Sequence, residues 1–190
     1  MFSFKNKYYL IIESTKDVNL ENIKKRNKFI IVYRNSKNSE NKDYLIKFRK
    51  TCKLKSILFY VANNINLAIE LNADGIYLSS YNKTFKALSV NRSKFSIIGS
   101  AHNSKEINMK VKQGCKEIFF SKLFVVSYDK KSPVLGVIKF NNYLKLNKSL
   151  IPLGGINITN LNSLNSIKCL GFALMSEIKK KPAKIFNRLF

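Results

Sequence analysis

Eight short runs of β-branched and aromatic residues recur along the chain, and stretches with the apolar spacing of a helix separate them. The runs are continuous, since neither residues 29–33 nor residues 57–61 include a charged side chain. Strands of a parallel sheet covered on both faces have this character, whereas half-exposed strands alternate apolar and polar residues. The expected strands are residues 8–12, 28–33, 56–61, 75–78, 95–99, 117–120, 150–153 and 171–175.

Helical stretches are expected between these strands and after the last one. They cover residues 20–25, 43–51, 65–71, 84–88, 104–113, 141–148, 158–167 and 182–188, the last with Pro182 in its first turn. Eight strand–helix units joined by right-handed crossovers close most economically into a (β/α)8 TIM barrel with eight parallel strands. An open, doubly wound sheet is the alternative. No linker rich in Pro, Gly or Ser divides the 190 residues, so a single barrel domain over 1–190 is expected.

The basic composition bears on the partner. The chain has 35 Lys and Arg residues against 11 Asp and Glu, a formal net charge of +24, which favours a polyanionic partner or substrate. The alternative is compositional drift of the genome, because scattered lysines predominate among many Asn, Ile and Ser residues. Only five basic residues are arginines, the side chain that forks onto phosphates. Since the sequence also has no zinc-finger spacing, RNP-like motif or Arg-rich helix, nucleic acid is the least favoured partner.

The cysteines and the hydropathy restrict the compartment. Cys52, Cys115 and Cys169 lie far apart, with only His102 as a histidine partner, so neither a zinc site nor a disulfide framework is expected. A reducing cytoplasm fits this pattern. No run of about 18 apolar residues exists, so the sequence predicts no membrane span and no membrane partner. The oligomeric state stays unknown.

The candidate site lies in the loops after the strands, because barrel sites are built at the carboxyl ends of the strands. These loops are poor in acid and rich in Ser, Asn and Lys, a composition that suits an anion better than a divalent metal. The most informative segment is 151–159, in which Gly154 and Gly155 follow a strand and precede an expected helix. Glycines let backbone N–H groups approach a phosphate, and a helix start adds partial positive charge. A tight turn without a ligand is the alternative.

Several segments, taken in order, look like the motifs of one known family. Residues 9–12 look like its opening strand, 32–37 (VYRNSK) like its Q-L-R-E-K, and 64–78 like its R-V-D-L-A…G-A-D-G-V-H-L. Residues 97–102 (IIGSAH) are similar to I-I-G-x-S-x-H with one residue fewer, and 151–156 (IPLGGI) to I-P-V-x-A-I-G-G-I. Over nearly its whole length the chain thus resembles a divergent member of the thiamine phosphate synthase and thiazole tautomerase family, whose members fold as (β/α)8 barrels.

The resemblance implies substitution at a primary carbon. A pyrimidine methyl diphosphate loses magnesium pyrophosphate, and the ring nitrogen of a thiazole phosphate captures the resulting cation, so cation and leaving group both need electrostatic help. Arg34 matches the family's diphosphate-contacting arginine, and Ser100 matches a serine near the diphosphate. The thiazole phosphate is expected at Gly154, Gly155 and Ser176. We expect all five residues to open onto one pocket.

Departures from the family pattern are as informative. The paired metal-binding aspartates fall at Asn63 and Asn82, and because amides carry no charge, Mg²⁺ binding is expected to be weak; no other cofactor is implied. Lys130 keeps the lysine of the P-T-x-T-K loop and is a third candidate catalytic residue, although both threonines are lost. Lys122 stands where tautomerase relatives have a histidine. It is a possible base if burial lowers its pKa, and otherwise a solvated lysine.

Two further residues are expected to have structural roles. His102 is expected to be a helix-start or packing residue, and Asp74 a cap or turn residue at the opposite, stabilising end of the barrel. Three functions stay open: a thiamine phosphate synthase-like enzyme acting on small phosphorylated substrates, a catalytically impaired phosphate-binding paralogue or tautomerase-like variant, and a nucleic-acid binder.

Overall fold

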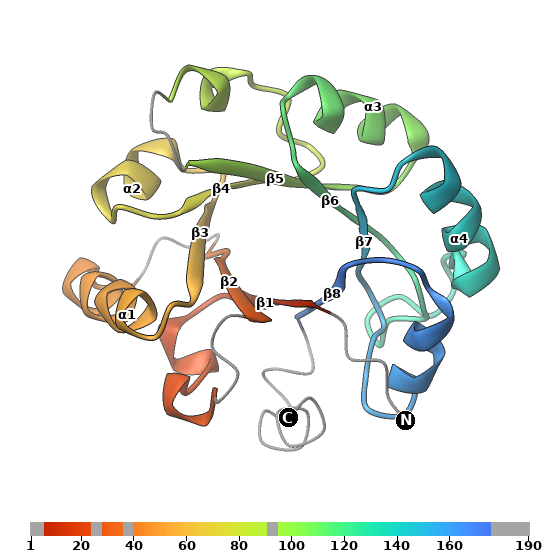
Figure 1. Cartoon of the computed structure of the whole chain (residues 1–190), viewed down its shortest axis with the longest axis horizontal. Coiled ribbons are helices and arrows are strands. Elements are labelled where there is room, and N and C mark those ends of the chain that lie inside the picture. The colour runs from red at the N-terminus through yellow and green to blue at the C-terminus, as the bar shows by residue number, and fades with distance from the viewer. Residues whose placement is uncertain (1–5, 24–27, 36–39, 91–94, 176–190) are drawn as a thin grey trace.

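The computed structural model describes residues 6–23, 28–35, 40–90 and 95–175. Eight parallel strands form the wall of a barrel, with helices around its outside (Figure 1). The described strands are β1 (Lys7–Ile12), β2 (Phe29–Tyr33), β3 (Leu58–Ala62), β4 (Gly75–Leu78), β5 (Ser96–Ala101), β6 (Glu117–Phe120), β7 (Leu150–Pro152) and β8 (Gly171–Leu174). All eight expected strands are therefore confirmed.

The sheet runs in the order β7-β6-β5-β4-β3-β2-β1-β8, so each strand pairs with its neighbour in sequence and β1 also pairs with β8. A single parallel bridge between Leu153 and Ala173 joins the ends of the sheet, just beyond β7 and on β8. The barrel prediction is thus confirmed and the open sheet was wrong.

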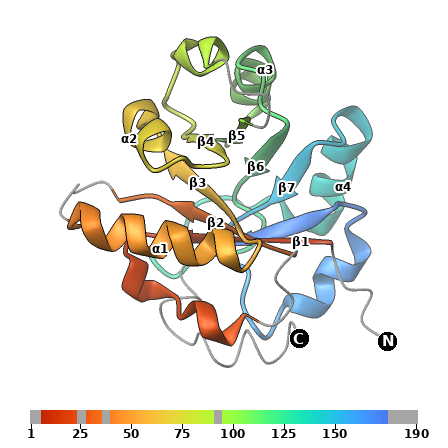
Figure 2. The same cartoon turned by 60° about the vertical axis from the view of Figure 1, so that its left-hand side comes forward.

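Within the described residues, four α-helices cover the outer face of the barrel: α1 (Lys42–Leu54), α2 (Ile65–Glu70), α3 (Ser104–Lys112) and α4 (Gly136–Leu146) (Figures 1 and 2). Each overlaps an expected helix, although α4 begins before the expected residue 141. Shorter 3₁₀ turns lie at Thr15–Asp17, Leu20–Asn22, Lys86–Ser89 and Leu161–Ser166. The expected helix at 182–188 lies outside the described residues. Among the described helices, none combines the length and apolar character needed to cross a membrane.

The helices expected at 84–88 and 158–167 form only as 3₁₀ turns, and so does the described part of the helix expected at 20–25. In the second segment the side chain of Asn157 accepts hydrogen bonds from the backbone N–H groups of Thr159 and Asn160 (2.8 and 3.3 Å), and Asn160 accepts one from the N–H of Asn157 (2.9 Å). Such local bonds compete with the backbone bonds of an α-helix.

Both faces of the strands are buried, which explains the continuous apolar runs. Along β1, Tyr9 and Ile11 belong to the cluster inside the barrel, whereas Tyr8, Leu10 and Ile12 belong to the larger cluster shared with the outer elements. Successive side chains of a strand point to opposite faces, so a strand between two cores needs apolar residues throughout.

At the amino end of the barrel, the carboxylates of Glu117 and Asp74 have hydrogen-bond partners within the protein. Glu117, at the start of β6, accepts hydrogen bonds from Tyr9 and Lys7. Burial and the charge of Glu117 raise the pKa of Tyr9. The carboxylate of Asp74 accepts from the backbone N–H of Phe59 (2.8 Å) and from the buried Arg49 (3.1 Å), which ties β3 to α1. Asp74 thus has the structural role expected of it.

Candidate functional site

Two cavities lie at the carboxyl ends of the strands. The larger, of about 690 Å³, is lined mainly by residues that follow β1 to β4. The smaller, of about 200 Å³, is lined mainly by residues of and after β4 to β8. Arg34 and Met175 line both cavities. The site therefore consists of two compartments that meet at an arginine.

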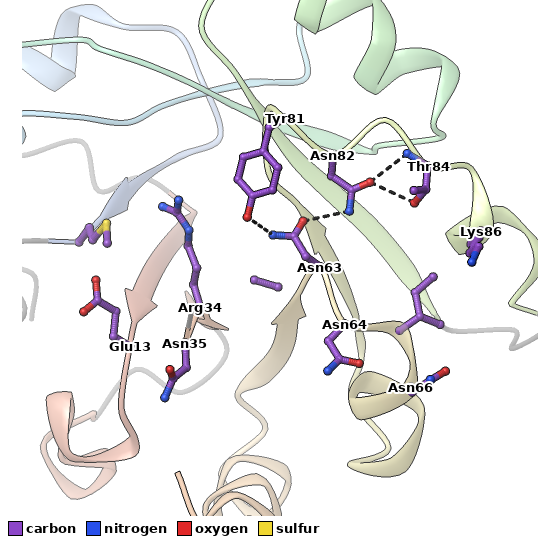
Figure 3. A pocket seen from close by; sticks show the side chains of 13 residues that line it. Glu13, Arg34, Asn35, Asn63, Asn64, Asn66, Tyr81, Asn82, Thr84 and Lys86 are labelled. Atoms are coloured by element: carbon purple, nitrogen blue, oxygen red, sulfur yellow. Dashed lines mark hydrogen bonds between the residues drawn. The ribbon is translucent and has the colours of Figure 1, made fainter. Parts of the chain in front are cut away.

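Arg34 follows β2 directly and is half-buried. Its backbone N–H donates to the carbonyl of Ile12 (2.7 Å), which extends the pairing of β1 and β2 to the rim of the site. Its side chain points into the larger cavity (Figure 3). Within the described ranges no carboxylate forms an ion pair with Arg34. A guanidinium in this position is available for an anion.

The wall of the larger cavity opposite Arg34 is a network of amides and hydroxyls centred on Asn63 (Figure 3). Asn63 directly follows β3. Its backbone has φ of 57°, a left-handed conformation that Asn tolerates. Its Oδ1 accepts from the N–H of Ser79 (3.0 Å) and from Nδ2 of Asn82 (3.1 Å). Its Nδ2 donates to the hydroxyls of Ser79 (2.7 Å) and Tyr81 (3.1 Å).

Asn82 is fixed in turn by its neighbours. Its Oδ1 accepts from the backbone N–H and the hydroxyl of Thr84, both at 3.0 Å. Its carbonyl oxygen accepts from Nζ of Lys110 (2.7 Å) and Nε2 of Gln113 (3.1 Å), two side chains beneath the loop that are fully buried. Asn63 and Asn82, which stand where the resemblance leads us to expect aspartates, are thus bonded to each other and supported from α3.

These residues do not fit a divalent metal ion. Mg²⁺ prefers carboxylate oxygens with formal charge, and Glu13 is the single carboxylate among the described residues that line the larger cavity. Across the described ranges, no three His, Cys, Asp or Glu side chains come together in a way that could hold a metal. The side-chain oxygens of Asn63 and Asn82 each already accept two hydrogen bonds.

The smaller cavity brings together Arg34, Ser100, Gly154 and Gly155, as the sequence predicts; Ser176, the fifth residue expected there, lies outside the described residues. Gly154 and Gly155 have φ of 95° and 69°. A Cβ on Gly155 would lie 2.4 Å from the carbonyl oxygen of Phe124, so a side chain has no room there. The close approach of two loops therefore requires this glycine, whether or not the turn binds a ligand.

The expected contribution of a helix start after the glycines was wrong, because a 3₁₀ turn (Leu161–Ser166) without a side-chain cap replaces the helix, and the side chain of Asn160 accepts from the N–H of Asn157 instead. The N–H groups of Gly154 and Gly155 donate to no acceptor within the part of the chain that the structure describes. An anion in this cavity would therefore be held by backbone donors and side chains alone.

Lys122 follows β6, lines the smaller cavity and pairs with Asp129. The hydrogen bonds from Lys122 and Ser132 lower the pKa of Asp129 to about 2. The base role predicted for Lys122 needed an apolar surrounding, whereas the structure gives it a carboxylate partner. Lys130 is exposed on the same loop and lines neither cavity.

His102 and Ser121 complete the rim of the smaller cavity, where Nδ1 of His102 lies 2.9 Å from the hydroxyl of Ser121. The backbone N–H of His102 donates to Glu106 in the first turn of α3, in line with the expected helix-start role. Sequence reasoning missed Tyr81, Lys110 and Gln113. Lys110 lies on a helix that also carries Lys105 and Lys112, and Gln113 directly follows that helix, so the sequence gave no sign that either is buried.

Comparisons with known proteins agree with this architecture. The sequence profile described as thiamine monophosphate synthase matches residues 9–178. A thiamine-phosphate synthase of Prochlorococcus marinus subsp. pastoris is 34% identical over 141 residues, which are 72% of this chain and 40% of that protein. One of Flavobacterium johnsoniae is 30% identical over 159 residues, 78% of this chain and 75% of that protein. The chain thus spans less than half of the Prochlorococcus relative.

Solved structures show the same fold. The thiamine phosphate pyrophosphorylase from Pyrococcus furiosus superposes with a TM-score of 0.70 at 17% identity, covering 97% of each chain. KGPDC from Streptococcus mutans superposes with a TM-score of 0.68 at 8% identity, covering 97% of this chain and 95% of that chain. At these identities the likeness concerns the barrel alone.

Proposed function

Because the chain belongs to the thiamine monophosphate synthase family, we propose that it couples a hydroxymethylpyrimidine diphosphate to a thiazole phosphate. The bond between the pyrimidine methylene carbon and the diphosphate oxygen breaks, and its electron pair leaves with pyrophosphate. The lone pair of the thiazole nitrogen then forms the new carbon–nitrogen bond. No proton is transferred, so the protein has to position two substrates and stabilise charge.

The observation that carries this proposal is the pair of compartments that meet at Arg34. The larger has room for the pyrimidine diphosphate. The smaller, with its glycine turn and Ser100, suits the thiazole phosphate. The leaving diphosphate would then lie beside Arg34, whose planar fork can donate to two of its oxygens.

Charge stabilisation is assigned to side chains rather than to a metal ion. Arg34 and Lys86 line the larger cavity, and negative charge develops on the diphosphate as the bond breaks. An ammonium or guanidinium does not bridge two phosphate groups as a metal does, so we expect slow turnover with little response to Mg²⁺.

We place the reaction in the cytoplasm, with small phosphorylated substrates and without nucleic acid or a membrane as partner. Cys52 and Cys115 are buried as thiols, which suits a reducing compartment.

A second candidate is a protein that binds the phosphate ester without turning it over. The neutral Asn63–Asn82 bond favours it, because two uncharged amides stand where the resemblance predicts charged metal ligands. Affinity without turnover would distinguish this candidate from the first.

The test combines binding and turnover. Thermal shift is measured with each substrate alone, with and without Mg²⁺, and thiamine phosphate and pyrophosphate are then quantified by chromatography. Equal amounts of both products support the synthase. A thermal shift with thiazole phosphate but no product supports the binding protein, and the absence of both would contradict both candidates.

A further inference from the structure

We propose that the larger cavity binds a diphosphate group as the free anion, without a divalent cation, and that the Asn63–Asn82 amide pair takes the place of that cation. The inference rests on the proposed function for the nature of the ligand. It concerns how this chain, with its own side chains, balances the charge of the site.

The orientation of both amides is fixed by backbone groups. The N–H of Ser79 can donate only to an oxygen, so Oδ1 of Asn63 faces it (3.0 Å). In the same way the N–H of Thr84 fixes Oδ1 of Asn82 (3.0 Å). The remaining arm of Asn82 is then Nδ2, which donates to Oδ1 of Asn63 (3.1 Å). The hydrogen on Nδ2 of Asn82 thus places a partial positive charge between the two side chains.

Two carboxylates could not hold this arrangement alone. With Asp at both positions, two charged oxygens would face each other at about the same separation with no proton between them, and repulsion would require a cation or a proton there. The amide supplies a hydrogen at that point. Asn63 also uses both of its N–H groups and accepts twice at its oxygen, so it would have to break this network to coordinate a metal.

The charge of the cavity also favours a free anion. Among the described residues that line it, Arg34 and Lys86 are cationic and Glu13 is anionic. One positive charge is therefore in excess, whereas aspartates at positions 63 and 82 would leave one negative charge in excess. A cavity of the second kind would need a cation before it could accept a diphosphate, and this one does not.

The pair is supported from the protein interior. Lys110 and Gln113 both donate to the carbonyl oxygen of Asn82, and Gln113 also donates to that of Thr84 (2.7 Å). Both side chains are fully buried. The loop that carries Asn82 is thus held in the position in which the amide pair forms, before any ligand arrives.

The test is calorimetric titration of inorganic pyrophosphate into the full chain, in chelator and in Mg²⁺. We expect the unaltered protein to bind in chelator, with an affinity in Mg²⁺ that is the same within about threefold, or lower because Mg²⁺ sequesters the ligand. A gain of tenfold or more in Mg²⁺, or no binding under either condition, would overturn the proposal. Binding without turnover would contradict the proposed function and leave this inference intact.

Variants sharpen the test. N63D/N82D restores two facing carboxylates, so pyrophosphate affinity should fall at least tenfold in chelator and recover at least tenfold in Mg²⁺. The matched control is N63D/N66D, because Asn66 lines the same cavity from α2. It adds equal charge without facing carboxylates, and its Mg²⁺ recovery should stay below threefold. Equal recovery in both variants would overturn the proposal, and circular dichroism checks that each variant folds.

Discussion

The two cavities of the site relate to the family pattern in opposite ways. The smaller one has Ser100 and the glycine turn where the resemblance leads us to expect them, whereas the larger one has amides where it leads us to expect two acids. The reason is physical. Gly155 is required by the close approach of Phe124, so its loss would disturb the barrel itself. Asn63 and Asn82 lie on loops, where two substitutions change the chemistry and leave the strands intact.

The largest expected effect is that of replacing Gly155. This substitution tests whether the glycine that lines the smaller cavity is also needed for the stability of the barrel. Gly155→Ala would place a Cβ 2.4 Å from a carbonyl oxygen at φ of 69°. We expect a loss of roughly 3 kcal/mol or more in unfolding free energy, from overpacking and from the left-handed backbone, together with loss of thiazole phosphate binding. Urea unfolding and thermal shift measure the two effects.

Gly136→Ala is the matched control, because Gly136 has φ of 65° but nothing within 4 Å of its Cβ position. It should show the backbone effect alone, about 1 kcal/mol. Equal losses of unfolding free energy in the two variants would mean that the close contact with Phe124 is not the reason why position 155 requires glycine.

Arg34 belongs to both cavities, so its replacement should affect both substrates. We expect Arg34→Gln to lower turnover roughly 100-fold, as removal of a donor from a developing anion does elsewhere, with weaker binding of each substrate. Arg34→Lys should recover part of the binding but little of the rate, because the planar fork is lost. Steady-state kinetics measure both, with Lys145→Gln on the exposed face of α4 as control. Unchanged turnover in Arg34→Gln would place the charge stabilisation elsewhere.

The sequence could predict the strands and the placement of the site, but not its detailed chemistry. Residues 75–78 and 117–120 were predicted to the residue, because apolar side chains make up most of each strand that is buried on both faces. Arg34 and Gly154 could be predicted to meet, since all carboxyl ends of parallel strands face one side. The Asn63–Asn82 bond spans 19 residues and depends on the left-handed backbone of Asn63, which no spacing rule encodes.

Replacing Lys110 tests whether this buried side chain supports the loop that carries Asn82 in the larger cavity. Lys110→Met should fill the same space but leave the side-chain oxygen of Gln113 without this donor. We expect a loss of about 1–3 kcal/mol in unfolding free energy at neutral pH, with weaker pyrophosphate binding and unchanged thiazole phosphate binding. Urea unfolding and calorimetry measure these effects. Equal weakening of both ligands would contradict a role confined to the larger cavity.

The same variant has a pH signature. Burial lowers the pKa of Lys110 from its ordinary value of 10.5. As pH rises towards 10.5, the folded chain therefore loses the proton of this residue before the unfolded chain does, so the unfolded chain binds more protons than the folded chain. The unfolding free energy of the parent should therefore increase with pH relative to that of Lys110→Met, up to about pH 10.5. A difference that shrinks over this range, measured by urea unfolding, would contradict the sign.

The smallest expected effect is at Asp129, which pairs with Lys122 in the lining of the smaller cavity. Hydrogen bonds from Lys122 and Ser132 lower its pKa from 3.8 to about 2. Its contribution to stability is therefore fully present above pH 3.8 and is lost as pH falls through about 2. Because Asp129 lies at the surface, Asp129→Asn should change the unfolding free energy little at pH 7.

The variant should show a smaller fall in unfolding free energy at acid pH than the parent, and pyrophosphate binding in the larger cavity should stay unchanged. Urea unfolding from pH 7 to 2 measures this, with Asp43→Asn in the first turn of α1 as control. If Asp129→Asn abolished thiazole phosphate binding at pH 7, the Lys122–Asp129 pair would be part of the binding site rather than a support for its loop.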